Sequence, residues 1–169
     1  MENLEIERKL VIKKPDFDRI RKMDGYTESK IEQIYIRTEN KFTSHRIRRR
    51  EYSTGVIEYT ETFKRRVDRM SAEEREVIID RAEYERLSLM IESGTHPVIK
   101  TRRTFDYLGR TFELDEYPEW SDSCIMEVEL PSVTERVTFP DFIEIIREVT
   151  GDGSYSNHSM SHLFPKELC

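Results

Sequence analysis

The sequence has few of the residues that break or cross-link a chain. Only six glycines, six prolines and two cysteines occur among 169 residues, so the composition is not of low complexity. Cys124 and Cys169 provide neither a disulfide framework nor a zinc-ligand spacing. No apolar run is long enough to span a bilayer, and the N-terminus lacks the apolar core of a signal peptide. These absences predict a cytoplasmic protein with no membrane partner.

Charged residues are unusually frequent. They make up 37% of the chain, whereas roughly a quarter is typical of globular proteins. Lysine and arginine number 28 against 34 acidic residues, for a net charge of -6. Because neither sign dominates, we expect no nucleic-acid partner. A length of 169 residues predicts one domain, 1–169, that can bury a core. So many charges exceed what solubility requires, and some of them are expected to face inward.

Alternation and turn signals predict eight strands and three helices. The expected strands cover 4–13, 31–38, 44–51, 56–65, 74–80, 98–105, 110–117 and 124–130. The expected helices cover 15–23, 81–92 and 140–149, with Gly94 as the C-terminal cap of the second. The polar tail from about residue 151 is expected to be irregular. Because consecutive strands lack long crossovers, the fold class is predicted to be α+β with an antiparallel sheet.

Like charges recur two residues apart within these strands, and residues i and i+2 point to the same face. The opposite face is often apolar, as with Leu4 and Ile6 or Phe112 and Leu114. The charged face carries six cations and eight carboxylates, namely Lys9, Arg46, Arg48, Lys64, Lys100 and Arg102, with Glu5, Glu7, Glu74, Glu76, Glu113, Asp115, Glu127 and Glu129.

Two arrangements can accommodate such a face. In an open sheet it would lie in water, whereas a closed barrel of eight strands would turn it into a wet lumen. Inside a lumen the carboxylates would repel each other unless a divalent cation lay between them, and the cations would need an anion. Carboxylate oxygens suit Mg2+ or Mn2+, and arginine and lysine bind phosphoryl oxygens. The pattern therefore favours metal-dependent phosphate chemistry without choosing a substrate.

The order of the charged pairs matches a known family. The opening motif is E-x-E-x-K, and R-x-R, T-x-K, E-x-E, K-x-R, an acidic pair and E-x-E-L follow it. This order resembles the CYTH superfamily, the triphosphate tunnel metalloenzymes, and within it the short bacterial inorganic triphosphatases. The resemblance implies an eight-stranded antiparallel β-barrel that forms a tunnel, with a few helices packed outside.

The resemblance also implies roles for individual residues. Lys64, Tyr35 and Lys9 would be catalytic, with the Tyr35–Lys64 pair activating the attacking water. The substrate triphosphate would be bound by Lys9, Arg46, Arg48, Lys64, Lys100 and Arg102. A Mg2+ or Mn2+ ion would be held by Glu5, Glu7, Glu127 and Glu129. A second metal, or the orientation of the basic residues and water, would fall to Glu74, Glu76, Glu113 and Asp115.

The expected activity is metal-dependent hydrolysis of inorganic triphosphate to pyrophosphate and phosphate. Hydrolysis of thiamine triphosphate or a nucleoside triphosphate, cyclic AMP formation by a class IV adenylate cyclase, and non-catalytic polyphosphate binding remain alternatives, and a homodimer is left open. One departure from the family concerns the closing motif, where Gly153-Ser154 stands in place of a basic residue before Tyr155. Either one phosphate contact at the tunnel mouth is missing in this chain, or Lys166 replaces it.

The remaining conspicuous residues are expected to have structural or surface roles. Trp120 is expected to anchor a loop by packing, and Cys124 to be buried and inert. A solvated hairpin end is expected for Arg65, Arg66 and Arg69. Surface positions are expected for His45, His158 and His162.

Overall fold

The computed structural model describes residues 3–40 and 43–168. The strands are β1 Asn3–Lys13, β2 Thr27–Tyr35, β3 Thr43–Tyr52, β4 Ile57–Arg66, β5 Ser71–Ile78, β6 Val98–Tyr107, β7 Arg110–Glu116, β8 Ser123–Glu129 and β9 Ile145–Glu148. The helices are α1 Phe17–Ile20, α2 Arg81–Ser88 and α3 Asn157–His162, and a 3-10 turn, η1, covers Gly153–Tyr155.

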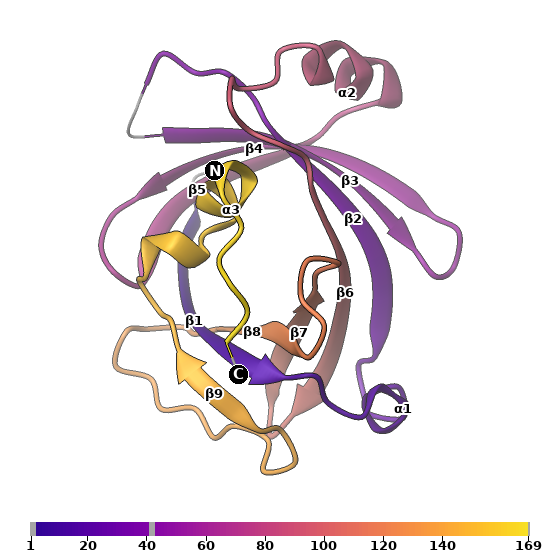
Figure 1. Ribbon diagram of the computed structural model, residues 1–169, viewed down its shortest axis with the longest axis vertical. Helices are drawn as coiled ribbons and strands as arrows, with labels where there is room; N and C mark the ends of the chain where they lie inside the picture. Colours follow the sequence, from indigo (N-terminus) through magenta and orange to yellow (C-terminus); the bar gives the residue numbers. More distant parts are fainter. Residues whose placement is uncertain (1–2, 41–42, 169) are drawn as a thin grey trace.

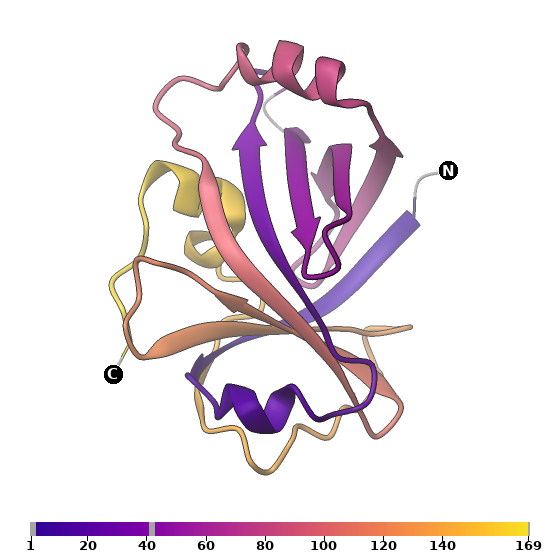
Figure 2. The same ribbon diagram turned by 90° about the vertical axis from the view of Figure 1, so that its right-hand side faces the viewer.

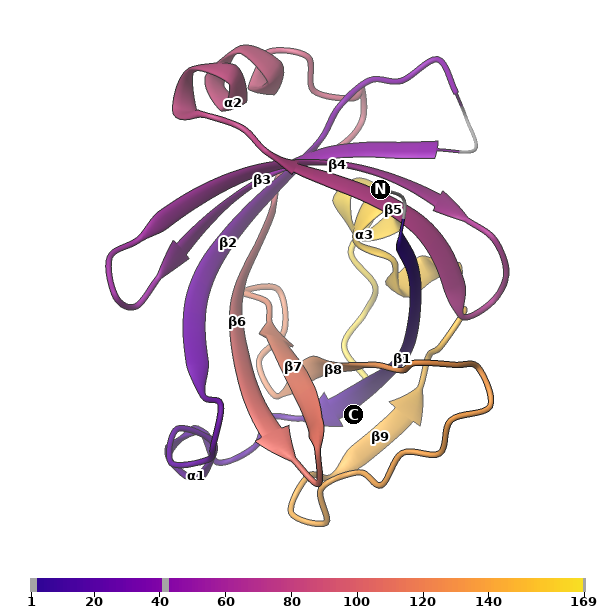
Figure 3. The ribbon, with the colours of Figure 1, turned by 180° about the vertical axis from the view of Figure 1, so that it is seen from behind.

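Eight antiparallel strands close into a barrel. They follow the order β5-β4-β3-β2-β6-β7-β8-β1, and a further pairing of β1 with β5 completes the ring. The ninth strand, β9, adds to β1 outside this ring. Figure 1 looks into the barrel with α3 in front, and Figure 3 shows the same ring from behind. The predicted fold class and the closed eight-stranded barrel are confirmed.

Strand β1 changes partners along one of its edges. Its residues Asn3–Ile6 pair with β5, and further along the same edge Leu10–Ile12 pair with β9. The other edge pairs with β8 from Glu7 to Lys13. The strand that carries the E-x-E-x-K motif is therefore held on both sides.

The outer face of the barrel is apolar and is covered at its two ends. At one end, outward-facing residues of β1, β7 and β8 form a buried cluster with Ile20 and with Ile143. Figure 2 shows α1 and the segment that follows β8 beneath the barrel, and α2 above it. At that upper end Tyr84 and Leu87 of α2 pack against Ile47. The alternation that puts charge inside thus also supplies the core outside.

Both outer helices begin at an acidic cap. The carboxylate of Asp16 accepts from the backbone of Asp18, so α1 begins at Phe17 and is shorter than the predicted 15–23. Asp80 caps α2 in the same way. The helix ends at Ser88, so Gly94, with a φ of +81°, is a turn residue and not the expected cap. Among the described residues, none of the helices is long and apolar enough to cross a membrane.

Two strands begin earlier than the apolar pattern indicates. β2 begins at Thr27 and not at residue 31, and it ends at Tyr35. β5 begins at Ser71 and not at residue 74. In both cases the added residues are mostly polar and pair with neighbouring strands, β2 with β3 and β6, and β5 with β1 and β4. Backbone pairing extends these strands where side-chain alternation gives no signal.

The predicted helix over 140–149 is wrong, because this segment contains strand β9. Phe142 and Ile143 pack into the cluster beneath the barrel, whereas Val149 belongs to a second cluster at one end of the lumen. The backbone N–H of Val149 donates to the carbonyl of Lys9 at 2.8 Å. Apolar residues at helical spacing here serve two separate cores, which an extended segment can reach.

The tail is ordered and closes one end of the lumen. Beyond the inward-facing charges, the rows continue with apolar residues, namely Val11, Val98 and Ile125 on strands and Tyr117 directly after β7. They pack with Tyr155 of η1 and Met160 of α3, so the expectation of an irregular tail is wrong. Trp120, only 2% exposed, joins this cluster, and its indole N–H donates to the carbonyl of Pro165 at 3.0 Å. Its expected role as a packing anchor is confirmed.

Candidate active site

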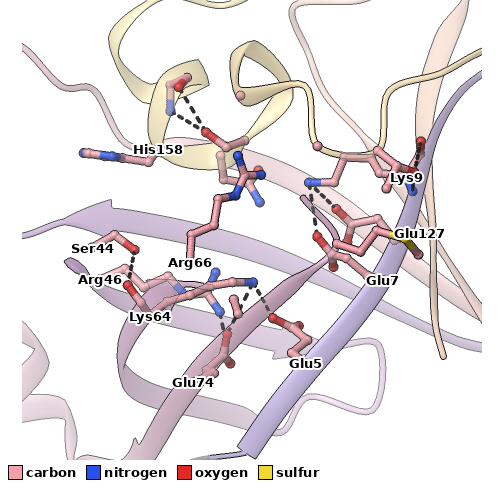
Figure 4. A pocket seen from close by; sticks show the side chains of 18 of the residues that line it. Glu5, Glu7, Lys9, Ser44, Arg46, Lys64, Arg66, Glu74, Glu127 and His158 are labelled. Carbon is pink, nitrogen blue, oxygen red and sulfur yellow. Dashed lines mark hydrogen bonds and ion pairs between the residues drawn. The ribbon is translucent and has the colours of Figure 1, made fainter. Parts of the chain in front are cut away.

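The inward-facing charges meet in one cavity of about 520 Å3. It is lined by all fourteen charged residues selected from the sequence except Asp115, and by Tyr35. Figure 4 shows two groups, with Glu5, Arg46, Lys64 and Glu74 on one side and Lys9, Glu7 and Glu127 on the other. The structure therefore brings together the side chains that the sequence placed on one face of the sheet.

The strand register places carboxylates of β1, β7 and β8 directly opposite one another. Glu7 lies opposite Glu129, and Glu113 lies opposite Glu127. Like charges directly opposite each other are unfavourable. Burial and the neighbouring Glu127 raise the pKa of Glu7. Burial, followed by Glu5 and Glu113, raises the pKa of Glu129. These carboxylates would lose their mutual repulsion if a cation bound between them.

The donors in this group fit a hard divalent cation. The expected ligands Glu5, Glu7, Glu127 and Glu129 offer only carboxylate oxygens, which suit Mg2+ or Mn2+. Glu127 already has cationic partners, since Lys9 Nζ lies 2.9 Å and Arg102 Nη2 lies 3.0 Å from its oxygens. Although burial opposes ionisation, these cations hold the pKa of Glu127 well below its usual value. Glu7 and Glu129 are the carboxylates that a cation would stabilise most.

Arg46 and Arg48 present buried donors to the cavity. Within the described parts of the chain, the Nε atoms of both residues have no hydrogen-bond partner. Their closest ion-pair contacts are 3.5 Å from Arg46 to Glu74 and 3.8 Å from Arg48 to Glu76. Burial and the neighbouring guanidinium of Arg46 lower the pKa of Arg48 to about 10. Buried donors without acceptors are costly, and an anion in the cavity would satisfy them.

Asp115 lies behind the cavity and holds two cations. It is fully buried and accepts from Lys100 Nζ at 2.5 Å and from Arg102 Nε at 2.6 Å. Despite burial, Arg102 and Lys100 lower the pKa of Asp115. Burial and the charge of Arg102 lower the pKa of Lys100 to about 8. This is the geometry of a carboxylate that orients basic residues.

The two expected catalytic lysines each contact carboxylates. Lys64 Nζ on β4 contacts Glu5 on β1, the two strands that flank β5, and lies 3.6 Å from Glu74. Lys9 Nζ lies between Glu127 and Glu7 and donates to the carbonyl of Tyr155 at 3.4 Å. Burial lowers the pKa of Lys9, but Glu127 and Glu7 more than compensate, and the pKa is raised. Burial likewise lowers the pKa of Lys64, but Glu5 and Glu7 raise it above its usual value, so the surroundings favour the charged form of both lysines.

Tyr35 has a different hydrogen-bond partner from the expected one. Its hydroxyl accepts from Gln33 Nε2 at 2.7 Å, and burial raises its pKa. In the described parts of the chain no hydrogen bond joins Tyr35 to Lys64. The catalytic roles of Tyr35, Lys64 and Lys9 stay predictions.

Three further arginines, Arg50, Arg66 and Arg69, line the cavity. Arg66 and Arg69 are exposed at the hairpin end as expected, but both also line the cavity, and Arg66 projects into it in Figure 4. Arg66 shares the parity of Lys64 on β4, a signal that could have identified it. Arg69 reaches the cavity from the β4–β5 turn, and its Nε donates to the carbonyl of Thr150 at 3.0 Å.

The other charged residues and histidines singled out from the sequence also lie partly inside and partly outside the cavity. Arg65 lies on the surface and contacts Glu73. Lys166 is exposed and does not line the cavity, so Arg69 supplies the positive charge beside the closing segment. The side chain of His158 is 39% exposed, as expected of a surface residue, but it also lines the cavity. His45 is largely covered and stacks on Phe63, whereas His162 is exposed as expected.

Comparison with known proteins gives matches among solved structures. No protein-family model and no curated protein matches the sequence. The structure of inorganic triphosphatase NE1496 is 27% identical with a TM-score of 0.60, over 95% of this chain and 99% of that one. Protein PH1819 of Pyrococcus horikoshii OT3 is 26% identical with a TM-score of 0.56, over 76% of this chain and 80% of that one.

A putative adenylate cyclase of Bacillus halodurans shares the fold, at 19% identity and a TM-score of 0.53, over 78% of this chain and 82% of that one. Together with the closed barrel and the ordered charged pairs within it, these similarities confirm that the chain resembles the CYTH superfamily, the triphosphate tunnel metalloenzymes.

Proposed function

We propose that this chain hydrolyses the terminal phosphoanhydride bond of inorganic triphosphate, giving pyrophosphate and phosphate. The observation that carries the proposal is that one cavity, in the part of the chain that the structure describes, contains both arginine donors that lack an acceptor and carboxylates that repel one another. Among the described residues, the buried Nε atoms of Arg46 and Arg48 lack acceptors, and in the same cavity Glu7 and Glu129 are crowded carboxylates with raised pKa values. A polyphosphate that chelates a divalent cation would satisfy both groups. The similarity to inorganic triphosphatase NE1496, over 99% of that chain, supports the same conclusion.

In this proposal the basic residues bind the substrate and the acidic residues hold the metal ion or position the basic residues. Arg46, Arg48 and Lys64 would bind phosphoryl oxygens and stabilise the charge that develops on them during reaction. Asp115 keeps Lys100 and Arg102 in position for the same purpose. Water attacks the terminal phosphorus in line, the bridging P–O bond breaks, and pyrophosphate leaves. A Mg2+ or Mn2+ ion held by Glu5, Glu7, Glu127 and Glu129 would neutralise substrate charge and help to orient the substrate.

The lining of the cavity favours an inorganic substrate over an organic one. Among the described residues, its only aromatic rings are those of Tyr35 and His158. Tyr35 is buried and packs against His158, with ring centroids 4.7 Å apart and the ring planes tilted by 42°. A nucleobase or thiazole would need an apolar or aromatic surface on which to stack. Charged side chains dominate the lining instead.

The purified chain should be incubated separately with inorganic triphosphate, thiamine triphosphate and ATP. Each substrate is tested with Mg2+, with Mn2+ and with a chelator, and the products are resolved by ion chromatography. We expect metal-dependent conversion of triphosphate to pyrophosphate and phosphate, with little product from ATP. Cyclic AMP from ATP would assign a cyclase instead. Binding without turnover of any of the three would leave a polyphosphate-binding protein.

A matched pair of variants tests the acidic group. Glu7→Gln removes a carboxylate from the cavity, whereas Glu73→Gln removes one from the outer face, where it contacts Arg65. We expect Glu7→Gln to lower metal-dependent turnover by about 100-fold or more, since even outer-shell partners of a metal cost about 10- to 100-fold. Glu73→Gln should turn over substrate normally. Unchanged activity of Glu7→Gln would refute the assignment of the acidic group.

A further inference from the structure

A second cluster of metal-ligating side chains lies at the edge of the cavity. His158 Nε2 is 2.7 Å from one carboxylate oxygen of Glu92, and His162 Nε2 is 3.7 Å from the other oxygen. One ligand atom from each of the three residues lies within 4.8 Å of the other two. The cluster thus offers two imidazole nitrogens and one carboxylate.

Local structure brings these three side chains to one point. His158 and His162 are four residues apart on α3, so they share one face of the helix. The backbone carbonyl of Glu92 accepts from Thr95, and its N–H donates to the carbonyl of Tyr35 at 2.8 Å. The two segments are also tied to each other, because the N–H of His96 donates to the carbonyl of Ser161 at 2.8 Å.

A second histidine–glutamate pair in the same chain shows what an ordinary contact looks like. His45 Nε2 lies 2.8 Å from Glu61 on the outer face of the barrel, and the ring stacks on Phe63. That pair contains one imidazole, and among the described residues no third side chain joins it to make a group that could hold a metal ion. In the α3 cluster a second imidazole faces the same carboxylate at 3.7 Å, a distance too long for a hydrogen bond.

The donor set differs from that of the acidic group in the cavity. The cavity carboxylates offer oxygen alone, which suits Mg2+ or Mn2+, whereas two imidazoles and one carboxylate suit Zn2+. Three protein ligands leave a fourth tetrahedral position for water. The side chains of His158, His162 and Glu92 are 39%, 42% and 29% exposed, so an ion can reach them from solvent.

We propose that Glu92, His158 and His162 form a zinc-type metal site that fastens α3 to the segment preceding β6. Because His158 also lines the cavity and its ring lies against that of Tyr35, the bound ion would fix one side of the cavity wall. This site is separate from the Mg2+ or Mn2+ group on β1 and β8, and it does not depend on the proposed hydrolysis.

The test uses the full chain after treatment with a chelator, returned to millimolar Mg2+ so that the cavity carboxylates are shielded. Zn2+ binding is followed by calorimetry, and Co2+ is used as a spectroscopic probe of four-coordinate geometry. We expect one Zn2+ per chain, intense visible Co2+ absorption, and a higher melting temperature with Zn2+. Glu92→Gln and His162→Ala should each weaken Zn2+ binding by about tenfold or more, while His45→Ala should bind normally.

Two other outcomes would contradict the proposed zinc site. Absence of Zn2+ binding by the wild-type chain would leave only an ion pair between α3 and Glu92. Equal Zn2+ binding by wild type and by a His158→Ala/His162→Ala double variant would place the ion on the cavity carboxylates. His162 is exposed, so His162→Ala remains informative if the double variant fails to fold. None of these measurements depends on turnover, so failure of the site and failure of the proposed hydrolysis are distinguishable.

Discussion

At the scale of single residues, neighbouring arginines on β3 have opposite environments. The side chain of Arg48 points into the cavity, while that of Arg49 points outward and donates to Glu51 at 2.8 Å. The alternation of a strand is enough to predict this difference. It is not enough to place Asp115, which shares the inward parity but is covered by the two cations that it binds. It also cannot place Arg69, whose reach depends on the conformation of a turn.

The pair of arginines gives a direct test of anion binding. Arg48→Ala should weaken the binding of tripolyphosphate by about 10- to 100-fold, because a hydrogen bond to a charged group contributes about 1.5–3 kcal/mol. Arg49→Ala should bind with the affinity of the wild type. Calorimetric titration in the presence of a chelator separates this contribution from that of the metal. Equal losses in the two variants would show that the general positive charge of the strand, and not the cavity, attracts the anion.

The lowered pKa of Lys100 predicts that anion binding depends on pH. Burial and Arg102 lower its pKa to about 8, so the ammonium loses its proton as the pH rises through that value. The affinity of the wild type for tripolyphosphate should therefore fall above about pH 8 relative to that of Lys100→Arg, whose guanidinium stays charged. Titration of the ligand itself is common to both proteins and cancels in the ratio of their dissociation constants. A ratio that is constant with pH would contradict the prediction.

At the scale of secondary-structure elements, the tail is a structural part of the barrel. Four inward-facing apolar residues continue the charged rows, and they pack with Tyr155 and Met160. The charged rows could be predicted from alternation, and so could most strands. The tail could not, because its short helix carries a polar sequence and is held by contacts with residues distant in the chain. The segment over 140–149 misleads for a related reason, since its apolar residues belong to two different cores.

Two side chains of the tail allow this contribution to be measured. Met160 is 4% exposed within the cluster at the end of the lumen, whereas Leu163, three residues on, is 80% exposed. Met160→Ala should lower the free energy of unfolding by about 2–5 kcal/mol. Leu163→Ala should change it by less than about 0.5 kcal/mol. Denaturant titration can follow the fluorescence of Trp120, the single tryptophan, which contacts Phe164 of the tail. Similar values for both variants would mean that the tail does not stabilise the barrel.

At the scale of the whole molecule, crowded carboxylates couple stability to pH and to metal. Burial raises the pKa values of Glu7, Glu113 and Glu129 above the ordinary value of 4.5, with Glu127 adding to the effect at the first two. At these three groups the folded chain therefore holds more protons than the unfolded chain at pH values just above 4.5. By linkage, these three groups make the free energy of unfolding fall as the pH rises through that window.

This coupling predicts that a bound metal ion changes how steeply the free energy of unfolding varies with pH. In a chelator, the free energy of unfolding should decrease from about pH 5 towards neutrality, once the acids with lowered pKa values are fully ionised. Millimolar Mg2+ should reduce that decrease, because a bound cation favours the ionised carboxylates. Denaturant titrations at several pH values, with Mg2+ and with a chelator, measure both slopes. Identical slopes under the two conditions would exclude a cation site among these carboxylates.

The partners of β1 impose an order in time on the assembly of the protein. This strand is synthesised before the other strands of the barrel, yet among the described residues its partners on β5 begin at residue 71, and the others lie on β8 and β9. The E-x-E-x-K segment must therefore wait, unpaired, while most of the chain emerges, and the entropy of closing such long loops slows its docking. Docking of β1 closes the ring and brings Glu5, Glu7 and Lys9 to the cavity. Maturation of the fold and appearance of the binding site are thus the same step, and a partly made chain has neither.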